Sequence, residues 1–515
     1  MVWIEAIFFT AVTFCVVYLL VMSAYQMALL LIYRATRGPD PDPARRFADD
    51  ELPRVTVQLP VYNEGELADQ CLRLAADLDY PHDRLQIQYL DDSDDGVTSD
   101  IARATVDRLR RERPDLDIQY LKRGDRSGFK AGALKYGTER ANGEFLAIFD
   151  ADFLIPRDFL RQTLHHFTDP SIGIVQARWD YTNADRSVFC RLQANKLDMH
   201  QMVEQSARAK IGAQAIFHGT AGVWRATALA EAGGWNCMSE VEDVELTIRS
   251  AASGRRMIYL DRLRIASELP ETVRGYVRQQ MRWKRGWTRV TLHYSRTVLN
   301  GPNSWRHKLD VLQRIHLSWG PLGALVMTLA VLPYFMVAAR LGLVWPAIAL
   351  YIVSLVMSLI GRVLESRTLA EDPWPRGPMK LPPLLRHAPL GYLMNLGMAW
   401  PLTQATLEGF GKGQVWEVTP KSGTTAGSVG HGGGAARRPL YVWGTLGTGA
   451  IGFAMAIISL LLGHPLAAFF YVMLVVGCGW IGGALWIDTR PPRPRPESLD
   501  TGTPEVEVAA VAASS

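Results

Sequence analysis

The tripeptide Asp150-Ala151-Asp152 carries the most informative acidic pattern in this chain of 515 residues. It directly follows Phe145–Phe149, an apolar run with the composition of a buried strand. Two carboxylates at a strand end can present oxygens to a hard divalent cation, whose remaining positions are filled by water and phosphate oxygens. Such an ion neutralises a leaving diphosphate. Asp-x-Asp alone arises often by chance, so its place after a strand is what predicts an Mg²⁺ or Mn²⁺ site at Asp150 and Asp152.

A second acidic pair, Glu242-Asp243, precedes the helical run Val244–Ala252. One interpretation is an acidic first turn that favours the helix dipole. The other is a general base that removes a proton from an acceptor hydroxyl. Inversion at a sugar carbon requires such a base on the face opposite the leaving group. The local sequence does not decide between the two.

A basic helical segment carries the pattern Gln279-Gln280-Met281-Arg282-Trp283, with further Lys and Arg residues on either side. One interpretation is an amphipathic basic helix at a membrane surface. In the other, Arg282 is a fixed cation against a diphosphate and Trp283 is a platform for a sugar ring. An indole suits that task because its face packs on apolar sugar faces and its N–H offers a hydrogen bond.

Alternating strand and helix patterns must position these residues. Strands are predicted at Val55–Leu59, Leu85–Leu90, Asp117–Lys122 and Phe145–Phe149, and helices at Glu66–Leu78, Asp100–Glu112 and Lys130–Arg140. This alternation predicts a mainly parallel sheet that is covered by helices on both faces.

Polar residues follow three of these strands, at Tyr62-Asn63-Glu64, Asp91-Asp92-Ser93 and Asp150-Ala151-Asp152. Ligands of open α/β sheets bind beyond the carboxyl ends of the strands, so these residues outline a nucleotide-binding rim. Between residues 50 and 300 the chain contains neither GxGxxG nor GxxxxGK[ST]. Dinucleotide-binding and P-loop folds are therefore disfavoured.

Apolar segments flank this region, and each approaches the roughly 20 residues that span a bilayer. The predicted spans are Ile4–Tyr33, Leu317–Ala339, Leu343–Ile360, Pro439–Leu462 and Pro465–Ile487. Arg34 and Arg37 follow the first span, so the positive-inside tendency predicts an outside N-terminus and a cytoplasmic catalytic domain. The less apolar stretch Pro389–Phe410 is interpreted as an interface helix, because basic residues lie beyond both of its ends.

The remaining composition narrows the function classes. A net charge of +4 over the whole chain gives no basic stripe for nucleic acid. The five cysteines show neither zinc-ligand nor redox spacing. We predict an N-terminal anchor (1–40), a catalytic domain (50–300), an interface helix with a hairpin (301–388), an interface helix with a loop (389–438), a second hairpin (439–490) and a disordered tail (491–515).

Taken together, the motifs resemble family 2 glycosyltransferases of the cellulose-synthase superfamily, and most closely the cellulose-synthase-like A group of mannan and glucomannan synthases. The motifs are Gln58–Glu64, Asp91-Asp92-Ser93, Lys130–Leu134, Asp150-Ala151-Asp152, Gln176–Trp179, Gly219–Arg225, Glu242-Asp243 and Gln279-x-x-Arg282-Trp283. The resemblance implies a GT-A (Rossmann-like) α/β domain, inverting transfer from a nucleotide sugar, and a multi-pass protein of the inner or plasma membrane.

The resemblance also implies roles for individual residues. The nucleotide sugar would be held by Tyr62, Glu64, Asp91, Asp92, Lys130, Asp150, Gln279 and Arg282. The metal would bind Asp150 and Asp152, with Asp152 the direct ligand, and Asp243 would be the base with Glu242 beside it. The acceptor would meet Trp283, His218, Gly219 and Thr220.

The segment Trp416–Lys421 resembles the gating loop of cellulose synthases through Trp416, Val418, Thr419 and Lys421. It favours a processive synthase that polymerises a β-1,4-linked hexose and extrudes it through a channel, for which Trp319, Trp345, Trp400 and Tyr334 are candidate lining residues. Two alternatives stay open: a single transfer to a lipid such as ceramide, diacylglycerol or a polyprenyl phosphate, and a non-catalytic membrane transporter or scaffold.

Two stretches depart from the family pattern. His218 stands where the family usually has Asn or Cys, and Lys284-Arg285-Gly286-Trp287 is more basic than the plant pattern. Both could border the acceptor. The donor is predicted as GDP-mannose or UDP-glucose, and the growing polysaccharide and the lipid bilayer are the other predicted partners. The motifs leave open whether oligomers or accessory subunits form.

Overall fold

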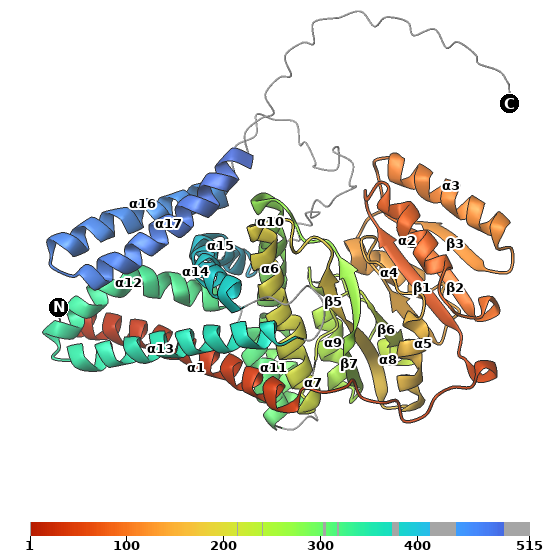
Figure 1. The fold of residues 1–515 in the computed structure, drawn as a ribbon, viewed down its shortest axis with the longest axis horizontal. Coiled ribbons are helices and arrows are strands. Elements are labelled where there is room, and N and C mark those ends of the chain that lie inside the picture. Colours follow the sequence, from red (N-terminus) through yellow and green to blue (C-terminus); the bar gives the residue numbers. More distant parts are fainter. Residues whose placement is uncertain are drawn as a thin grey trace, which may run out of the picture.

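The computed structural model describes residues 2–213, 215–238, 240–301, 305–316, 319–372, 381–411 and 439–488. The gating-loop motif at 416–421 and the tail at 491–515 lie outside these residues. An α/β unit and a bundle of apolar helices lie at opposite ends of the molecule (Figure 1). The helices that contact both are found between them.

The α/β unit is built on a seven-stranded mixed sheet with the order β3-β2-β1-β4-β6-β5-β7. The strands are β1 (Val55–Val61), β2 (Leu85–Asp91), β3 (Asp117–Lys122), β4 (Phe145–Ile148), β5 (Ile172–Tyr181), β6 (Gly222–Arg225) and β7 (Arg256–Ser267). The four strands predicted from the sequence are confirmed, and β1 to β4 pair in parallel. Strand β6, which the sequence patterns did not reveal, runs antiparallel to β4 and β5.

Helices cover both faces of the sheet, as the strand–helix alternation predicted. They are α2 (Leu67–Ala76), α3 (Val97–Glu112), α4 (Phe129–Thr138), α5 (Phe159–Thr163), α6 (Val188–Asp198), α7 (Ser206–Lys210), α8 (Ala226–Glu231) and α9 (Glu242–Ala252), with 3₁₀ turns at Asp49–Glu51, His82–Arg84 and Leu164–Thr168 and a π-helical segment, η4 (Met199–Gln205), between α6 and α7.

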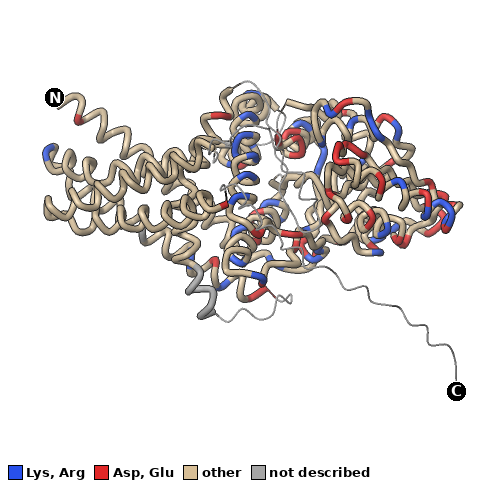
Figure 2. The backbone as a smooth tube through the Cα atoms, turned by 90° about the horizontal axis from the view of Figure 1, so that it is seen from above, with Lys and Arg blue, Asp and Glu red and all other residues tan. Residues whose placement is uncertain are grey.

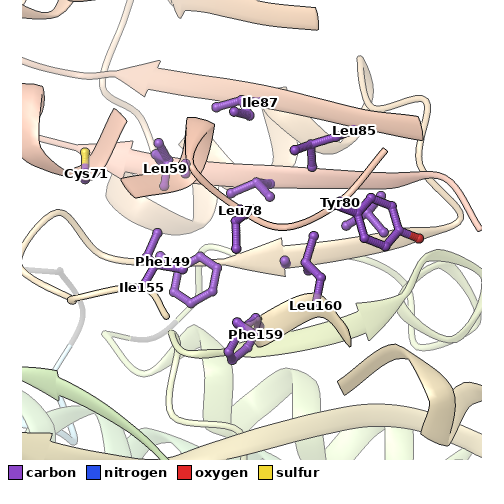
Figure 3. Packing of buried hydrophobic residues seen from close by; sticks show 14 of the residues in the cluster. Leu59, Cys71, Leu78, Tyr80, Leu85, Ile87, Phe149, Ile155, Phe159 and Leu160 are labelled. Atoms are coloured by element: carbon purple, nitrogen blue, oxygen red, sulfur yellow. The ribbon is translucent and has the colours of Figure 1, made fainter. Parts of the chain in front are cut away.

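Alternate side chains of the central strands pack into two separate cores. Leu59, Ile87 and Phe149 point to the face that α2, α3 and α5 cover (Figure 3). Leu146 and Ile148 point to the opposite face, against α4, α8 and α9. Burying such a side chain fully stabilises the fold by about 1.5–3 kcal/mol. Both faces of these strands are buried, and the polar side chains of β1 and β2 that this buries hydrogen-bond to one another, Thr56 to Gln86 and Gln58 to Gln88.

The bundle contains five helices that are long and apolar enough to cross a membrane, among the described residues. They are α1 (Val2–Thr36), α12 (Gly320–Arg340), α13 (Val344–Ala370), α16 (Leu440–Leu461) and α17 (Pro465–Asp488). Figure 2 shows this bundle almost without charged residues, which gather instead where it meets the α/β unit. An ion pair of 2.7 Å joins Arg340 to Glu5 at the far end of α12 and α1. The count of five spans matches the prediction, and the domain boundaries stay predictions.

Between the two parts lie α10 (Val273–Asn300), α11 (Trp305–His316), α14 (Leu381–Gly397) and α15 (Ala399–Glu408). The single interface helix predicted at Pro389–Phe410 is therefore wrong in detail, since the chain breaks at Met398 into α14 and α15. Pro401 explains the break because it has no N–H to donate to the carbonyl of Gly397. Gly397 also lies against α17, where an added Cβ would stand 2.3 Å from the carbonyl oxygen of Gly477.

Buried ion pairs connect the α/β unit to the bundle. Arg178 on β5 is almost fully buried and forms ion pairs with Asp198, Asp261 and Asp372. Asp372 lies just after the end of α13, and its carboxylate is 3.1 Å from the guanidinium of Arg178. These three carboxylates outweigh the effect of burial and raise the pKa of Arg178. Removing one partner from a buried pair leaves a charge without compensation, so this contact fixes α13 against the sheet.

Candidate active site

A cavity of about 270 Å³ opens at the carboxyl ends of β1 and β4. Thirteen of the residues predicted to bind or react line it: Tyr62, Glu64, Asp92, Lys130, Asp150, Asp152, His218, Gly219, Glu242, Asp243, Gln279, Arg282 and Trp283. They come from chain segments more than 200 residues apart, and the fold brings them to one rim.

Two predicted site residues do not line the cavity but support it from beneath. Asp91 accepts hydrogen bonds from the backbone of Ser93 and the hydroxyls of Ser99 and Tyr120. Its carboxylate is thus occupied inside the protein, and a direct contact with nucleotide is not supported. Thr220 is fully buried, and its hydroxyl accepts a 2.8 Å hydrogen bond from the backbone N–H of Asp150. Thr220 therefore positions Asp150 and does not face the acceptor.

One end of the cavity carries aromatic and charged groups suited to a nucleoside. The guanidinium of Arg126 lies 3.2 Å from the ring centroid of Tyr62, whose hydroxyl donates to Asp94. Asp92 forms an ion pair with Arg123. Neither arginine belongs to a motif predicted from the sequence. Their only signal in the sequence is the basic composition of the short stretch just before Lys130.

Lys130 lies at the centre of the cavity. Its ammonium donates to Asp150 Oδ1 at 2.5 Å and to the carbonyl of Gly219 at 2.9 Å. Burial alone would lower the pKa of Lys130, but the negative charges of Asp150 and Glu242 outweigh it and raise that pKa. Lys130 is therefore a permanent cation facing several carboxylates.

Glu242 and Asp243 form the first turn of α9, so the helix begins at the acidic pair and not after it. Asp243 accepts a 2.8 Å hydrogen bond from the N–H of Val244. Burial raises the pKa of both carboxyl groups, and the nearby charge of Asp243 raises that of Glu242 further. A carboxylate with a raised pKa is a stronger base at neutral pH, which suits proton abstraction.

Gly219 is the tightest backbone position in the cavity. Its φ is +78°, and an added Cβ would lie 3.0 Å from Asp243 Oδ2 and 3.4 Å from Lys130 Nζ. The neighbouring Gln176 holds this turn, since its side chain accepts from the N–H of His218 and donates to the carbonyl of Thr220. The Gly-Thr motif thus lets backbone approach the charged centre closely.

Helix α10 forms the wall opposite the strands and contributes Gln279, Arg282 and Trp283. Burial lowers the pKa of Arg282, although the surrounding acids Glu242 and Asp150 oppose this effect. Further along α10, Arg289 forms a 2.9 Å ion pair with buried Glu240, just before the acidic pair. This ion pair therefore holds α10 against the loop that precedes Glu242 and Asp243.

The two carboxylates of the Asp-x-Asp motif fit the chemistry of a divalent-cation site. The side chain of Asp150 is 31% exposed in the cavity, and Asp152 is 5% exposed and accepts from the N–H of Glu268 at 3.5 Å. No group of three or more His, Cys, Asp or Glu side chains suited to a metal occurs among the described residues. Two carboxylates completed by phosphate oxygens and water are a usual ligand set for Mg²⁺.

A second cavity of about 570 Å³ adjoins the first, between the α/β unit and the apolar bundle. Its walls come from α1, α6, α10, α13 and α14. The four aromatic residues suggested from sequence as channel candidates do not line it: Tyr334 is fully buried among helices and Trp345 is 76% exposed. Its indoles are instead Trp283 and Trp287, which also line the first cavity.

Replacing Gly219 by Ala should disrupt the charged centre. The added methyl group meets Asp243 and Lys130, so we expect the rate of sugar transfer to fall at least tenfold. The matched control is Gly254→Ala, because Gly254 has a φ of +81° with nothing within 4 Å of an added Cβ. Both variants should lose about 1–2 kcal/mol from backbone strain. Equal transfer rates, measured beside thermal unfolding, would contradict the prediction.

Known proteins resemble this chain over its α/β unit. Residues 53–286 match the family model described as "Glycosyltransferase like family 2". Glucomannan 4-beta-mannosyltransferase 1 of Oryza sativa subsp. japonica is 40% identical over 258 residues, which are 49% of this chain and 49% of that protein. Glucomannan 4-beta-mannosyltransferase 9 of Arabidopsis thaliana is 38% identical over 244 residues, 47% of this chain and 45% of that protein. The chain thus spans about half the length of the curated relatives it matches.

Among solved structures, the mannosyltransferase PcManGT from Pyrobaculum calidifontis, in complex with GDP-Man and Mn2+, aligns with a TM-score of 0.50 and 23% identity. The alignment covers 77% of this chain and 99% of that chain. This likeness confirms the GT-A-like mixed sheet. The resemblance to the cellulose-synthase-like A group, drawn from the motifs, is confirmed as well. Residues 53–286 of this chain thus resemble a glycosyltransferase-like family 2 domain.

Proposed function

We propose that the protein is a membrane-embedded glycosyltransferase that transfers mannose from GDP-mannose to the end of a growing β-1,4-linked polysaccharide. The observation that carries this proposal is the meeting of Lys130, Asp150, Asp243 and Arg282 in one cavity with Trp283 on its wall. The curated relatives are named glucomannan mannosyltransferases, which favours mannose over glucose as the transferred sugar.

The cations of the cavity would receive the donor diphosphate. Lys130 and Arg282 both line the cavity, and each would neutralise phosphate charge as the sugar–phosphate bond breaks. Asp150 and Asp152 would hold Mg²⁺ or Mn²⁺, which supplies further positive charge to the leaving group when bound. Tyr62, Asp92 and Arg126 would surround the nucleoside at the adjoining end.

Asp243 would act as the general base. It would accept the proton of the acceptor hydroxyl while that oxygen forms its bond to the anomeric carbon and the diphosphate departs. Attack opposite the leaving group inverts the configuration at that carbon. Trp283 would hold the acceptor sugar by its apolar face, so that the hydroxyl stays near the carboxylate.

We further propose that the α/β unit faces the cytoplasm and that the product leaves across the membrane. The second cavity supports this proposal because it continues from the acceptor wall to the helices α1, α13 and α14. Arg34 and Arg37 at the end of α1 support the orientation, since basic residues favour the cytoplasmic side. The gating-loop motif, which lies outside the described residues, also favours a processive enzyme.

The direct test is a donor survey on the purified full chain in nanodiscs with Mg²⁺ or Mn²⁺. GDP-mannose should yield a long polymer that an endo-β-1,4-mannanase digests, and UDP-glucose should yield far less. Asp243→Asn should lower the rate by about 10²- to 10⁴-fold through loss of the base. Asp100→Asn is the matched control, since Asp100 is an exposed acid in the first turn of α3. Normal polymer from Asp243→Asn, or no transfer from either donor, would refute the proposal.

The rate of transfer should depend on pH through Asp243. Burial raises the pKa of this carboxyl group, and the base is active only when ionised. Activity should therefore fall as the pH drops through the raised pKa, well above the ordinary aspartate value of about 3.9. Measuring kcat against pH with saturating donor would show this acid limb. A profile that stays flat down to the ordinary aspartate range would exclude Asp243 as the base.

A second candidate function is a single transfer to a lipid-linked phosphate. Lys284 favours it, because this lysine lines the second cavity and has no ion-pair partner among the described residues. Burial and the neighbouring charge of Lys196 lower the pKa of Lys284 to about 8. An ammonium in an interior cavity would match a phosphate better than a neutral polysaccharide.

Lys284→Met separates the two candidates. If the acceptor carries a phosphate, loss of a charge-assisted contact should raise its KM by about tenfold or more. If the acceptor is a neutral polysaccharide, we expect a change of less than about threefold. The KM is measured with polyprenyl phosphate and with mannan oligosaccharides on the same preparation. Lys308→Met on α11 serves as the control, because Lys308 lines neither cavity.

A further inference from the structure

The two cavities meet at a neck that four residues line on both sides: Leu197, His200, Trp283 and Trp287. Anything that extends from the acceptor position into the second cavity must pass these side chains. His200 is the only one of the four whose side chain can both donate and accept hydrogen bonds at neutral pH. The two indoles offer broad apolar faces beside it.

His200 is held in place by a chain of buried charges. Its Nδ1 lies 3.2 Å from Glu204, which in turn contacts Arg208 at 3.1 Å. His200 and Glu204 both belong to η4, the π-helical segment between α6 and α7. Such segments interrupt regular helices often at functional sites. The other ring nitrogen of His200 has no partner in the described part of the chain.

His218 stands beside His200 and lines the first cavity at the neck's active-site end. Their ring centroids are 5.4 Å apart in an edge-to-face arrangement, and the ring of Trp179 lies 5.4 Å from His218 as well. His218 Nε2 is hydrogen-bonded to Gln205, whereas its Nδ1 is buried and has no hydrogen-bond partner within the described ranges of the chain. Burial also lowers the pKa of His218 well below its usual value, so the ring is neutral.

Two ring nitrogens without hydrogen-bond partners among the described residues, set against two indole faces, match the chemistry of a hexopyranose. A sugar ring presents apolar C–H faces and hydroxyls around its edge. A ligand without a matching hydroxyl leaves a buried polar group of the site without a hydrogen bond. The resulting loss of binding free energy makes such a site selective. A hydrocarbon chain would leave both nitrogens unsatisfied.

We propose that the neck is a sugar subsite for the unit behind the terminal acceptor sugar, in which His200 and His218 read the positions of its hydroxyls. This inference rests on the proposed transfer to a saccharide acceptor. It assigns His200, which no motif singled out, as a specificity-determining residue. It also gives a role to His218, the histidine that departs from the family pattern.

The experiment measures binding of mannose, β-1,4-mannobiose and β-1,4-mannotriose to the full chain in nanodiscs, by calorimetry and without donor. His200→Ala should weaken mannobiose and mannotriose by about three- to tenfold, the loss of one hydrogen bond, and leave mannose unchanged. The matched control is His82→Ala, a surface histidine that pairs with Asp115 at 2.7 Å. It should bind all three sugars like the unaltered protein.

A second variant guards against a folding defect. His200→Asn keeps a polar atom near Glu204, so its thermal unfolding should match that of the unaltered protein while mannobiose binding still weakens. Equal affinities of His200→Asn, His200→Ala and the unaltered protein for mannobiose would overturn the inference.

Transfer assays on the same variants separate the two proposals. If the unaltered chain makes polymer but His200→Ala elongates mannobiose with unchanged KM, the subsite is wrong and the proposed function stands. If no transfer occurs but mannobiose binding depends on His200, the subsite stands and the proposed function is wrong. A loss in kcat alone, with the acceptor KM unchanged, would also count against the subsite.

Discussion

The structure depends on one electrostatic constraint: the positive charge of the buried Lys130 ammonium must be compensated by the negative charges of the acids around it. Asp150, Glu242 and Asp243 are close enough to raise the pKa of this lysine despite its burial. In return, the lysine limits how far burial and mutual repulsion raise the pKa of the two acids on α9. Charges of this kind persist in a protein interior only when they are paired and rigidly held. The rest of the α/β unit supplies that rigidity.

Each side chain of the centre is fixed by a different part of the fold. Parallel strand β4 delivers Asp150, and Thr220 beneath it bonds the Asp150 backbone. Helix α4 carries Lys130, and the turn at Gly219 brings a carbonyl oxygen within 2.9 Å of its ammonium. Glu242 and Asp243 lie in the N-terminal turn of helix α9, where the helix dipole favours the ionised form of Asp243. Glycine adopts the φ of +78° at position 219 without strain, so this turn can lie close to the charged centre.

Helix α10 connects this centre to the apolar bundle. It presents Arg282 and Trp283 to the cavity, binds Glu240 through Arg289, and reaches Glu408 on α15 through Arg285 at 3.0 Å. Gly409 allows that approach, since an added Cβ would lie 2.6 Å from Thr288. The bundle is tied a second time through Arg178 and Asp372. The Arg178–Asp372 pair is buried, whereas Glu408 in the pair with Arg285 is exposed; both ion pairs connect the bundle to the walls of the cavity.

The sequence alone determined four of the strands, the five apolar helices and thirteen of the residues that line the cavity. Hydrophobic periodicity and charge depletion are local properties, and a motif such as Asp150-Ala151-Asp152 follows its strand directly. The antiparallel strand β6, the close packing of Gly397 against α17 and the inward-facing role of Asp91 were decided only by tertiary structure, because each depends on partners distant in the chain. Gly397 packs closely against α17. The carboxylate of Asp91 accepts hydrogen bonds from Tyr120 on β3 and Ser99 on α3. The neck at His200 belongs to the same class, since η4 and α10 meet there only after the sheet and the bundle have packed together.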